Sequence, residues 1–88
     1  MNAIITVVGS DKVGIIAKVS TFLAERGINI VDISQTVLSG NFVMMMIVAI
    51  EESSDLSLVK QDLSTLGETL GVSISLMHEK VFSAMHRI

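Results

Sequence analysis

Residues 9–14, with the sequence Gly-Ser-Asp-Lys-Val-Gly, stand where an apolar β-like run gives way to a helical pattern. The first backbone N–H groups of a helix are unpaired and carry partial positive charge, and glycine lets another atom approach the backbone closely. A carboxylate or a phosphate could therefore bind at this turn. The alternative is a capped turn in which Gly14 only lets the helix pack near the sheet. The motif is not a P-loop, because Ile15 and Ile16 stand where Lys and Ser/Thr are required, and it is not GxGxxG.

Methionine and histidine are the other side chains that could bind a ligand, in this case a soft metal ion. The sequence holds six Met, two His and no Cys. Consecutive residues of a strand point to opposite faces, so Met44, Met45 and Met46 cannot all reach one ion. We expect the methionines to fill the core or an interface. His78 and His86 have no acid nearby in a catalytic spacing. The sequence therefore predicts no metal site, no cofactor and no enzyme activity.

The composition limits the partners and the location. Six Lys or Arg stand against nine Asp or Glu, which gives a net charge of −3, and the chain has no Tyr or Trp. Nucleic-acid binding needs clustered positive charge or stacking rings, so we expect no nucleic-acid partner. The longest apolar run, residues 42–50, is much shorter than the roughly 20 residues of a membrane-spanning helix. Because the N-terminus does not resemble a signal peptide, we expect no membrane association and a cytoplasmic location.

The size of the chain favours an oligomer. Its 88 residues suffice for one small domain, and 50% of them are hydrophobic. A domain of this size buries only about 60–65% of its unfolded surface, and without cysteine no disulfide or thiolate metal site can stabilise it. We expect association between copies of the chain to supply the missing burial.

Hydrophobic periodicity divides the chain into six elements and a tail. Short β-branched or alternating runs predict strands, and apolar residues at helical spacing predict amphipathic helices. In chain order the elements are a strand 3–8, a helix 12–26, a strand 28–38 with a bulge, a strand 42–50, a helix 56–70, a strand 72–77 and a short helical or extended tail. This order predicts an α+β, ferredoxin-like βαββαβ sandwich, with a four-stranded antiparallel sheet and two helices on one face.

Local signals mark the ends of the two predicted helices. Asp11 is the expected N-cap of the first helix, and Ser53 or Ser54 of the second. Gly27 and Gly71 are expected to end them.

Two of the predicted strands would leave apolar surface or backbone groups uncovered. Residues 42–50 are apolar on both faces, which indicates either a central strand with an apolar outer face or a face covered by a second subunit. Residues 28–38 form an edge strand in this fold and contain no Pro or Lys. An edge without such protection is expected to pair with another strand.

The first half of the chain resembles an ACT domain, a small regulatory module of amino-acid-metabolising enzymes and some repressors. The matching pattern is an apolar strand, then Asp11-Lys12-x-Gly14-Ile15-Ile16, an apolar helix, and Gly27-x-Asn29-Ile30. Element order and length agree over residues 1–78, which form the expected ACT-like domain. The C-terminal tail, residues 79–88, is similar to that of free-standing single-ACT-domain (UPF0237-like) proteins.

The resemblance implies a regulatory, ligand-sensing module that forms a homodimer or higher oligomer and binds an amino acid or similar metabolite between subunits. Asp11, an acid where the ligand's carboxylate would lie, suits an α-amino group better, or caps the helix. The alternative function is a ligand-free module that regulates a partner protein through its dimer surface and its tail. The residues that the resemblance assigns to the ligand site are Ser10, Asp11, Lys12, Val13 and Gly14 on one wall, and Asn29 and Asp32 on the other.

Overall fold

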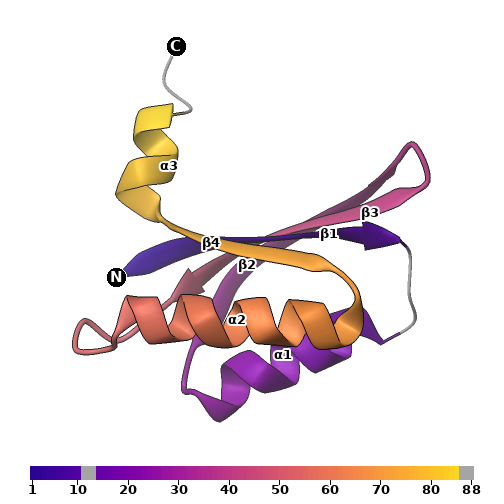
Figure 1. Ribbon diagram of the computed structural model, residues 1–88. Coiled ribbons are helices and arrows are strands. Elements are labelled where there is room, and N and C mark those ends of the chain that lie inside the picture. The colour runs from indigo at the N-terminus through magenta and orange to yellow at the C-terminus, as the bar shows by residue number, and fades with distance from the viewer. Residues whose placement is uncertain (11–13, 86–88) are drawn as a thin grey trace.

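The computed structural model describes residues 1–10 and 14–85 and confirms the expected α+β, ferredoxin-like architecture (Figure 1). The four strands form one antiparallel sheet in the order β2-β3-β1-β4. The last strand continues directly into a third helix, which occupies most of the expected tail. The elements are β1 (Asn2–Ser10), α1 (Ile15–Glu25), β2 (Asn29–Leu38), β3 (Asn41–Ala49), α2 (Leu56–Leu70), β4 (Ser73–His78) and α3 (Glu79–Met85).

The core lies between the sheet and the helices α1 and α2, which cover the same face (Figure 1). Alternate residues of β1 point toward the helices, so that Ile5 and Val7 are completely buried. Met44 and Met46 of β3 are also completely buried in this core. The methionines of β3 therefore fill space, as the sequence predicts, and a core of flexible side chains adapts to an irregular interface.

The strand residues that alternate with the core residues point to the outer face of the sheet. This face is partly covered by α3, which lies on the side opposite to α1 and α2 (Figure 1). Ile4 lies on this face beside α3 and is only 6% exposed, whereas Val8, farther along β1, is 37% exposed. Part of the apolar outer face is thus covered within the chain, by a segment whose position the sequence pattern does not indicate. Cover of the remainder by a second subunit stays a prediction.

The first turn of α3 is held by a side chain of the preceding strand. The Lys80 N–H donates a hydrogen bond to Nδ1 of His78, at 3.0 Å. A side chain that accepts from an unpaired N–H of the first turn acts as a helix cap. This contact gives His78 a structural role.

The helix starts differ from the predictions. The first helix begins at Ile15 instead of residue 12, and its N-cap is Gly14. Asp11 as N-cap is therefore wrong, although Asp11 itself lies outside the described residues. The N-cap of α2 is Asp55, not Ser53 or Ser54, and its carboxylate accepts from the N–H groups of Ser57 and Leu58 at 3.0 and 3.4 Å. Several Ser and Asp residues stand before α2, and the helical pattern alone does not select among them.

The helix ends and the bulge agree with the predictions. Gly27 has a φ of 69° and follows the last turn of α1. The N–H of Ile28 donates to the carbonyl of Leu23 at 2.9 Å. A hydrogen bond of this kind commonly closes a helix that ends at glycine. Gly71 ends α2 with a φ of 73°. The pairing of β2 with β3 shifts between Ile30 and Asp32, so the bulge lies at residue 31.

None of the described helices is long and apolar enough to cross a membrane.

Candidate ligand-binding site

The turn between β1 and α1 contains the glycine that the sequence analysis singles out. Gly14 has a φ of 88° and a ψ of 0°, and no side chain caps the helix at this position. The first intrahelical bond runs from the Lys18 N–H to the Gly14 carbonyl, at 3.0 Å. Thus no described side chain caps the first turn of α1, whereas the corresponding end of α2 is capped by Asp55. An uncapped, exposed helix start can accept a carboxylate.

Gly14 is required by the backbone conformation rather than by packing. A Cβ atom built on Gly14 would meet nothing within 4 Å, so the interpretation that Gly14 lets the helix approach the sheet is wrong. Its φ of 88° lies in a region that residues with a side chain rarely adopt. The same open space leaves the helix start accessible to a ligand or to a second subunit.

We predict that Gly14→Ala lowers the free energy of unfolding by about 1–2 kcal/mol, because alanine is strained at positive φ. Gly14→Asn is the matched variant, since its side chain also meets no neighbour but asparagine tolerates this conformation better. Urea unfolding of both variants measures the difference. An alanine variant as stable as the asparagine variant would contradict this explanation.

Ser10 ends β1 and Asn29 begins β2, and their pairing partners place them at opposite ends of the sheet within one chain. Ser10 pairs with Asn41 of β3, and Asn29 pairs with Ala49 of the same strand. The eight positions from Asn41 to Ala49 correspond to about 26 Å, at about 3.3 Å per residue. A single protomer therefore does not bring the two predicted walls of the site together. Asp11, Lys12 and Val13 lie outside the described residues.

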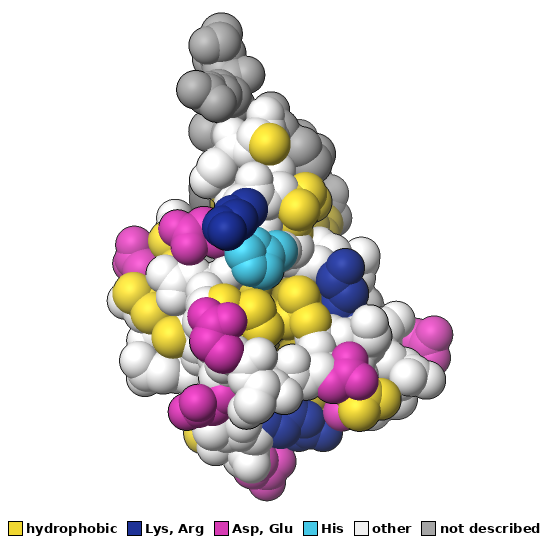
Figure 2. Space-filling model, turned by 90° about the vertical axis from the view of Figure 1, so that its left-hand side faces the viewer, with side chains coloured by type: hydrophobic (Ala, Val, Ile, Leu, Met, Phe, Trp, Pro, Cys, Tyr) yellow, Lys and Arg dark blue, Asp and Glu magenta, His cyan; other side chains and the backbone are white. Residues whose placement is uncertain are grey.

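Asn29 borders a hollow of about 290 Å³ at the N-terminal end of β1. The amino group of Met1 donates to the Ile50 carbonyl at 2.8 Å and lies 3.1 Å from Oε1 of Glu52. The sequence analysis does not identify these neighbours. Figure 2 looks onto this side of the molecule and shows acidic side chains around a central group of hydrophobic ones. The lining residues are Met1, Gly27, Asn29, Ala49, Ile50, Glu51 and Glu52.

Asp32 borders a different hollow, on the outer face of the sheet. It pairs with Ile47, which in turn pairs with Ile4 of β1. Its Oδ1 accepts a hydrogen bond from the N–H of Ile33 at 2.8 Å. Asp32 is therefore far from Gly14, but it lies on the same face of the sheet as Asn29, because the two residues pair with Ile47 and Ala49, which are two positions apart on β3.

The unpaired edge of β2 carries exposed apolar side chains. Nine large hydrophobic residues of the described chain are exposed, and four of them belong to this one strand. Apolar side chains beside an unpaired row of backbone groups are typical of a strand that pairs with another chain. The four residues, with their exposed fractions, are Val31 (56%), Ile33 (41%), Val37 (63%) and Leu38 (66%).

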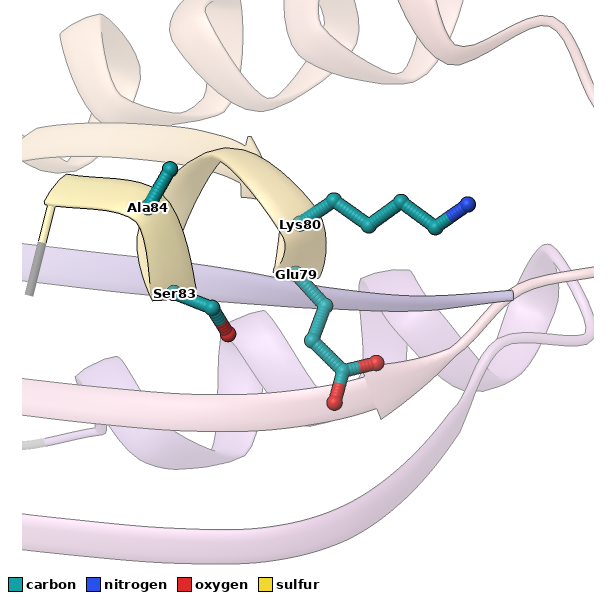
Figure 3. Close-up of a pocket in the computed structure, with 4 residues that line it drawn as sticks. All are labelled: Glu79, Lys80, Ser83 and Ala84. Carbon is teal, nitrogen blue, oxygen red and sulfur yellow. The ribbon is translucent and has the colours of Figure 1, made fainter. Parts of the chain in front are cut away.

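A further hollow beside α3 is lined by the polar residues Glu79, Lys80 and Ser83 and by Ala84. Its volume is about 600 Å³, and its lining residues all come from this one short helix. Figure 3 shows the side chain of Lys80 pointing away from that of Glu79, and Ala84 pointing away from both Glu79 and Ser83. Within residues 1–10 and 14–85, no group of three or more His, Asp or Glu could hold a metal ion.

The described architecture places the chain in the class of small ferredoxin-like domains, with an open edge strand and a glycine-capped helix start. Similarity to known proteins assigns the chain to one family within this class. The model of the ACT domain matches residues 2–77, and the chain belongs to this family of regulatory domains.

Relatives of the same length support the assignment. A UPF0237 protein of Lactococcus lactis is 50% identical over 88 residues, which is the full length of both chains. The solved ACT domain protein from Streptococcus pneumoniae superposes with a TM-score of 0.87 at 48% identity and covers 98% of each chain. A protein assigned as a glycine cleavage system transcriptional repressor shares the fold, with a TM-score of 0.79 at 22% identity over 85% of this chain and 44% of its own.

Proposed function

We propose that this chain is a non-catalytic regulatory module that dimerises through β2 and binds an amino acid at the dimer interface. The observation that carries the proposal is the exposed apolar edge of β2, described above. Its unpaired backbone groups can continue the sheet into a second copy of the chain. Pairing of identical edges around a twofold axis makes the two strands antiparallel.

An antiparallel β2–β2 pairing would unite the two separated walls. The C-terminal end of β2 lies at the same level as the β1–α1 turn, because Leu38 and Ser10 both pair with Asn41. In the antiparallel arrangement, this end of one protomer lies beside Asn29 of the other. The offset along the strands between Ser10 and Asn29 is thereby removed across the interface, and about 14 Å remains across the sheet, because β3 and β2 lie between β1 and the β2 of the partner.

The chemistry of the two walls suits an amino acid. The start of α1, which no described side chain caps, offers backbone N–H groups to a carboxylate. The amide of Asn29 can accept from an ammonium group or donate to a carboxylate. A ligand held by both protomers stabilises that arrangement of the dimer over others. Ligand binding would in this way regulate a partner protein that binds only one arrangement of the dimer.

We predict that one or a few of the twenty amino acids raise the melting temperature, and that Asn29→Ala abolishes the rise. A ligand at about 100 times its Kd adds about 2.7 kcal/mol to the stability of the form that binds it. Gln61→Ala is the matched control, because it also removes an exposed side-chain amide but lies on α2, outside both walls. Thermal unfolding and calorimetry measure the effect.

Sedimentation of Asn29→Ala separates a lost ligand contact from a lost dimer. We expect a dimer of unchanged mass that no longer responds to the amino acid. If no amino acid changes the melting temperature or releases heat, the sensor function is wrong, and the ligand-free interaction module becomes the better explanation.

A further inference from the structure

A hollow of about 180 Å³ lies on the outer face of the sheet, against α3. The outer face is the side of the sheet opposite to α1 and α2 (Figure 1), and neither Gly14 nor Asn29 lines the hollow. The walls are mostly apolar and come from every strand except β4, together with α3. The lining residues are Ile4, Asp32, Ile33, Ser34, Met45, Ile47 and Phe82.

The bulge in β2 determines that a carboxylate reaches this hollow. Ile30 pairs with Val48, a core residue, and Asp32 pairs with Ile47 on the outer face, so residue 31 is skipped. In a regular strand, Asp32 would be paired with Met46 and would lie on the core face. The extra residue therefore turns the carboxylate to the outer face.

The Asp32 carboxylate has no cationic neighbour among the described residues. The ion pairs found there join Met1 with Glu52 and Arg26 with Asp62. One oxygen of Asp32 accepts from the backbone N–H of Ile33 at 2.8 Å, which fixes the side chain beside its own strand. A negative charge fixed at the rim of an apolar hollow is complementary to a cation with a hydrocarbon group.

We propose that this hollow binds small primary amines that carry an aromatic or branched hydrocarbon group. The ammonium group would donate to Asp32, with the Ser34 hydroxyl as a second acceptor, and the hydrocarbon would lie between Ile4, Ile47 and Phe82. An apolar cavity of about 150 Å³ holds a benzene ring, so a volume of about 180 Å³ accommodates a ring with one further carbon.

The same lining disfavours amino acids. It contains no Lys or Arg, so an amino acid would bring its carboxylate close to that of Asp32 without a compensating charge. Like charges this close repel each other even at an exposed position such as that of Asp32. The hollow would thus bind a different class of ligand from the proposed amino-acid site. Its proposed binding of amines does not depend on that site.

Binding of an amine would also hold α3 on the sheet. This helix has only seven residues, which are too few to form a stable helix alone. It contributes Phe82 to the wall of the hollow. A ligand that contacts both Phe82 and the sheet favours the docked position of the helix. Amide exchange in α3 should therefore slow when the amine binds.

Titration with benzylamine, followed by NMR, tests the proposal. We expect saturable shifts of the Ile4, Met45 and Ile47 resonances, with at least tenfold weaker binding of benzyl alcohol and of phenylalanine. Asp32→Asn should weaken benzylamine binding about tenfold, because a neutral amide replaces the carboxylate. Glu68→Gln removes an equal charge from an exposed position of α2 and should leave binding unchanged.

Three outcomes would overturn the proposal. The first is the absence of shifts at the outer face, and the second is equal binding of benzylamine to the wild type and to Asp32→Asn. The third is a change of the outer-face resonances with protein concentration instead of amine, which would show that a second copy of the chain occupies the hollow. Phe82→Leu should keep α3 docked but weaken binding, whereas Phe82→Ala should also speed amide exchange in α3.

Discussion

Lysine at both Val31 and Val37 should convert the proposed dimer into monomers. Both side chains are more than half exposed and both belong to β2. In an antiparallel pairing of two β2 strands, the region of Val31 in one protomer lies near that of Val37 in the other. The double variant would therefore remove apolar contacts and also place lysines opposite lysines, which destabilises paired strands. Lysine on an edge strand is also what natural proteins use to prevent such pairing.

The expected size of this effect is a dissociation constant at least about 100-fold higher, which corresponds to about 2.7 kcal/mol. Sedimentation equilibrium measures it, and circular dichroism verifies that the monomer keeps its fold. Val81→Lys is the matched control, because Val81 on α3 is 50% exposed and lies away from β2. A wild-type protein that is monomeric at micromolar concentration, or a double variant that sediments like the wild type, would disprove the proposed interface.

Leu63→Ala should cost about 3 kcal/mol of the free energy of unfolding. The Leu63 side chain is 1% exposed and lies in the core between α2 and the sheet. Truncating a buried leucine removes its transfer free energy and leaves a cavity, and such changes cost about 2–5 kcal/mol. A domain of this length is stable by only about 4–13 kcal/mol, so a large part of its stability depends on this one side chain.

Leu58→Ala is the control for the same helix. Leu58 is 57% exposed, and its truncation should change the free energy of unfolding by no more than about 0.5 kcal/mol. Chemical denaturation at one fixed protein concentration is the measurement, because the stability of an oligomer depends on concentration. Equal losses in the two variants would mean that the core is not where the structure places it.

The fold follows from the sequence because local and long-range signals agree. The apolar spacing from Leu56 to Leu70 corresponds to a helix with the same bounds in the structure. The glycines at the ends of the helices and the irregular alternation in β2 likewise correspond to positive φ angles and a bulge. Each of these features is a short-range property, so the sequence pattern carries it directly.

The start of α1 and the position of α3 could not be predicted in this way. Gly14 resembles an ordinary member of the helical pattern, because nothing in its neighbours reveals a positive φ. The side of the sheet on which α3 lies depends on its contacts with β1, which is far away in the sequence. Similarly, the position of Asp32 depends on which residue the bulge skips, and the sequence pattern indicates only that a bulge exists.

The candidate site was predicted only in its parts. The sequence identifies a glycine-containing turn and an asparagine after α1, and the structure places them at opposite ends of one chain. A site that is completed by a second protomer has no signature in the periodicity of one sequence. The hollow on the outer face was not predicted either, because its residues come from four separate elements.

The central place of β1 has a consequence for folding during synthesis. The first strand to leave the ribosome pairs with residues 41–49 on one side and with residues 73–78 on the other. No N-terminal fragment can therefore complete the sheet, and the hydrophobic residues of β1 stay unprotected until most of the chain has been made. Such distant contacts slow folding and make it cooperative. A chain that stops before β4 would leave the backbone groups on one side of β1 unpaired. Truncated products should therefore aggregate or be degraded rather than persist as partly folded domains.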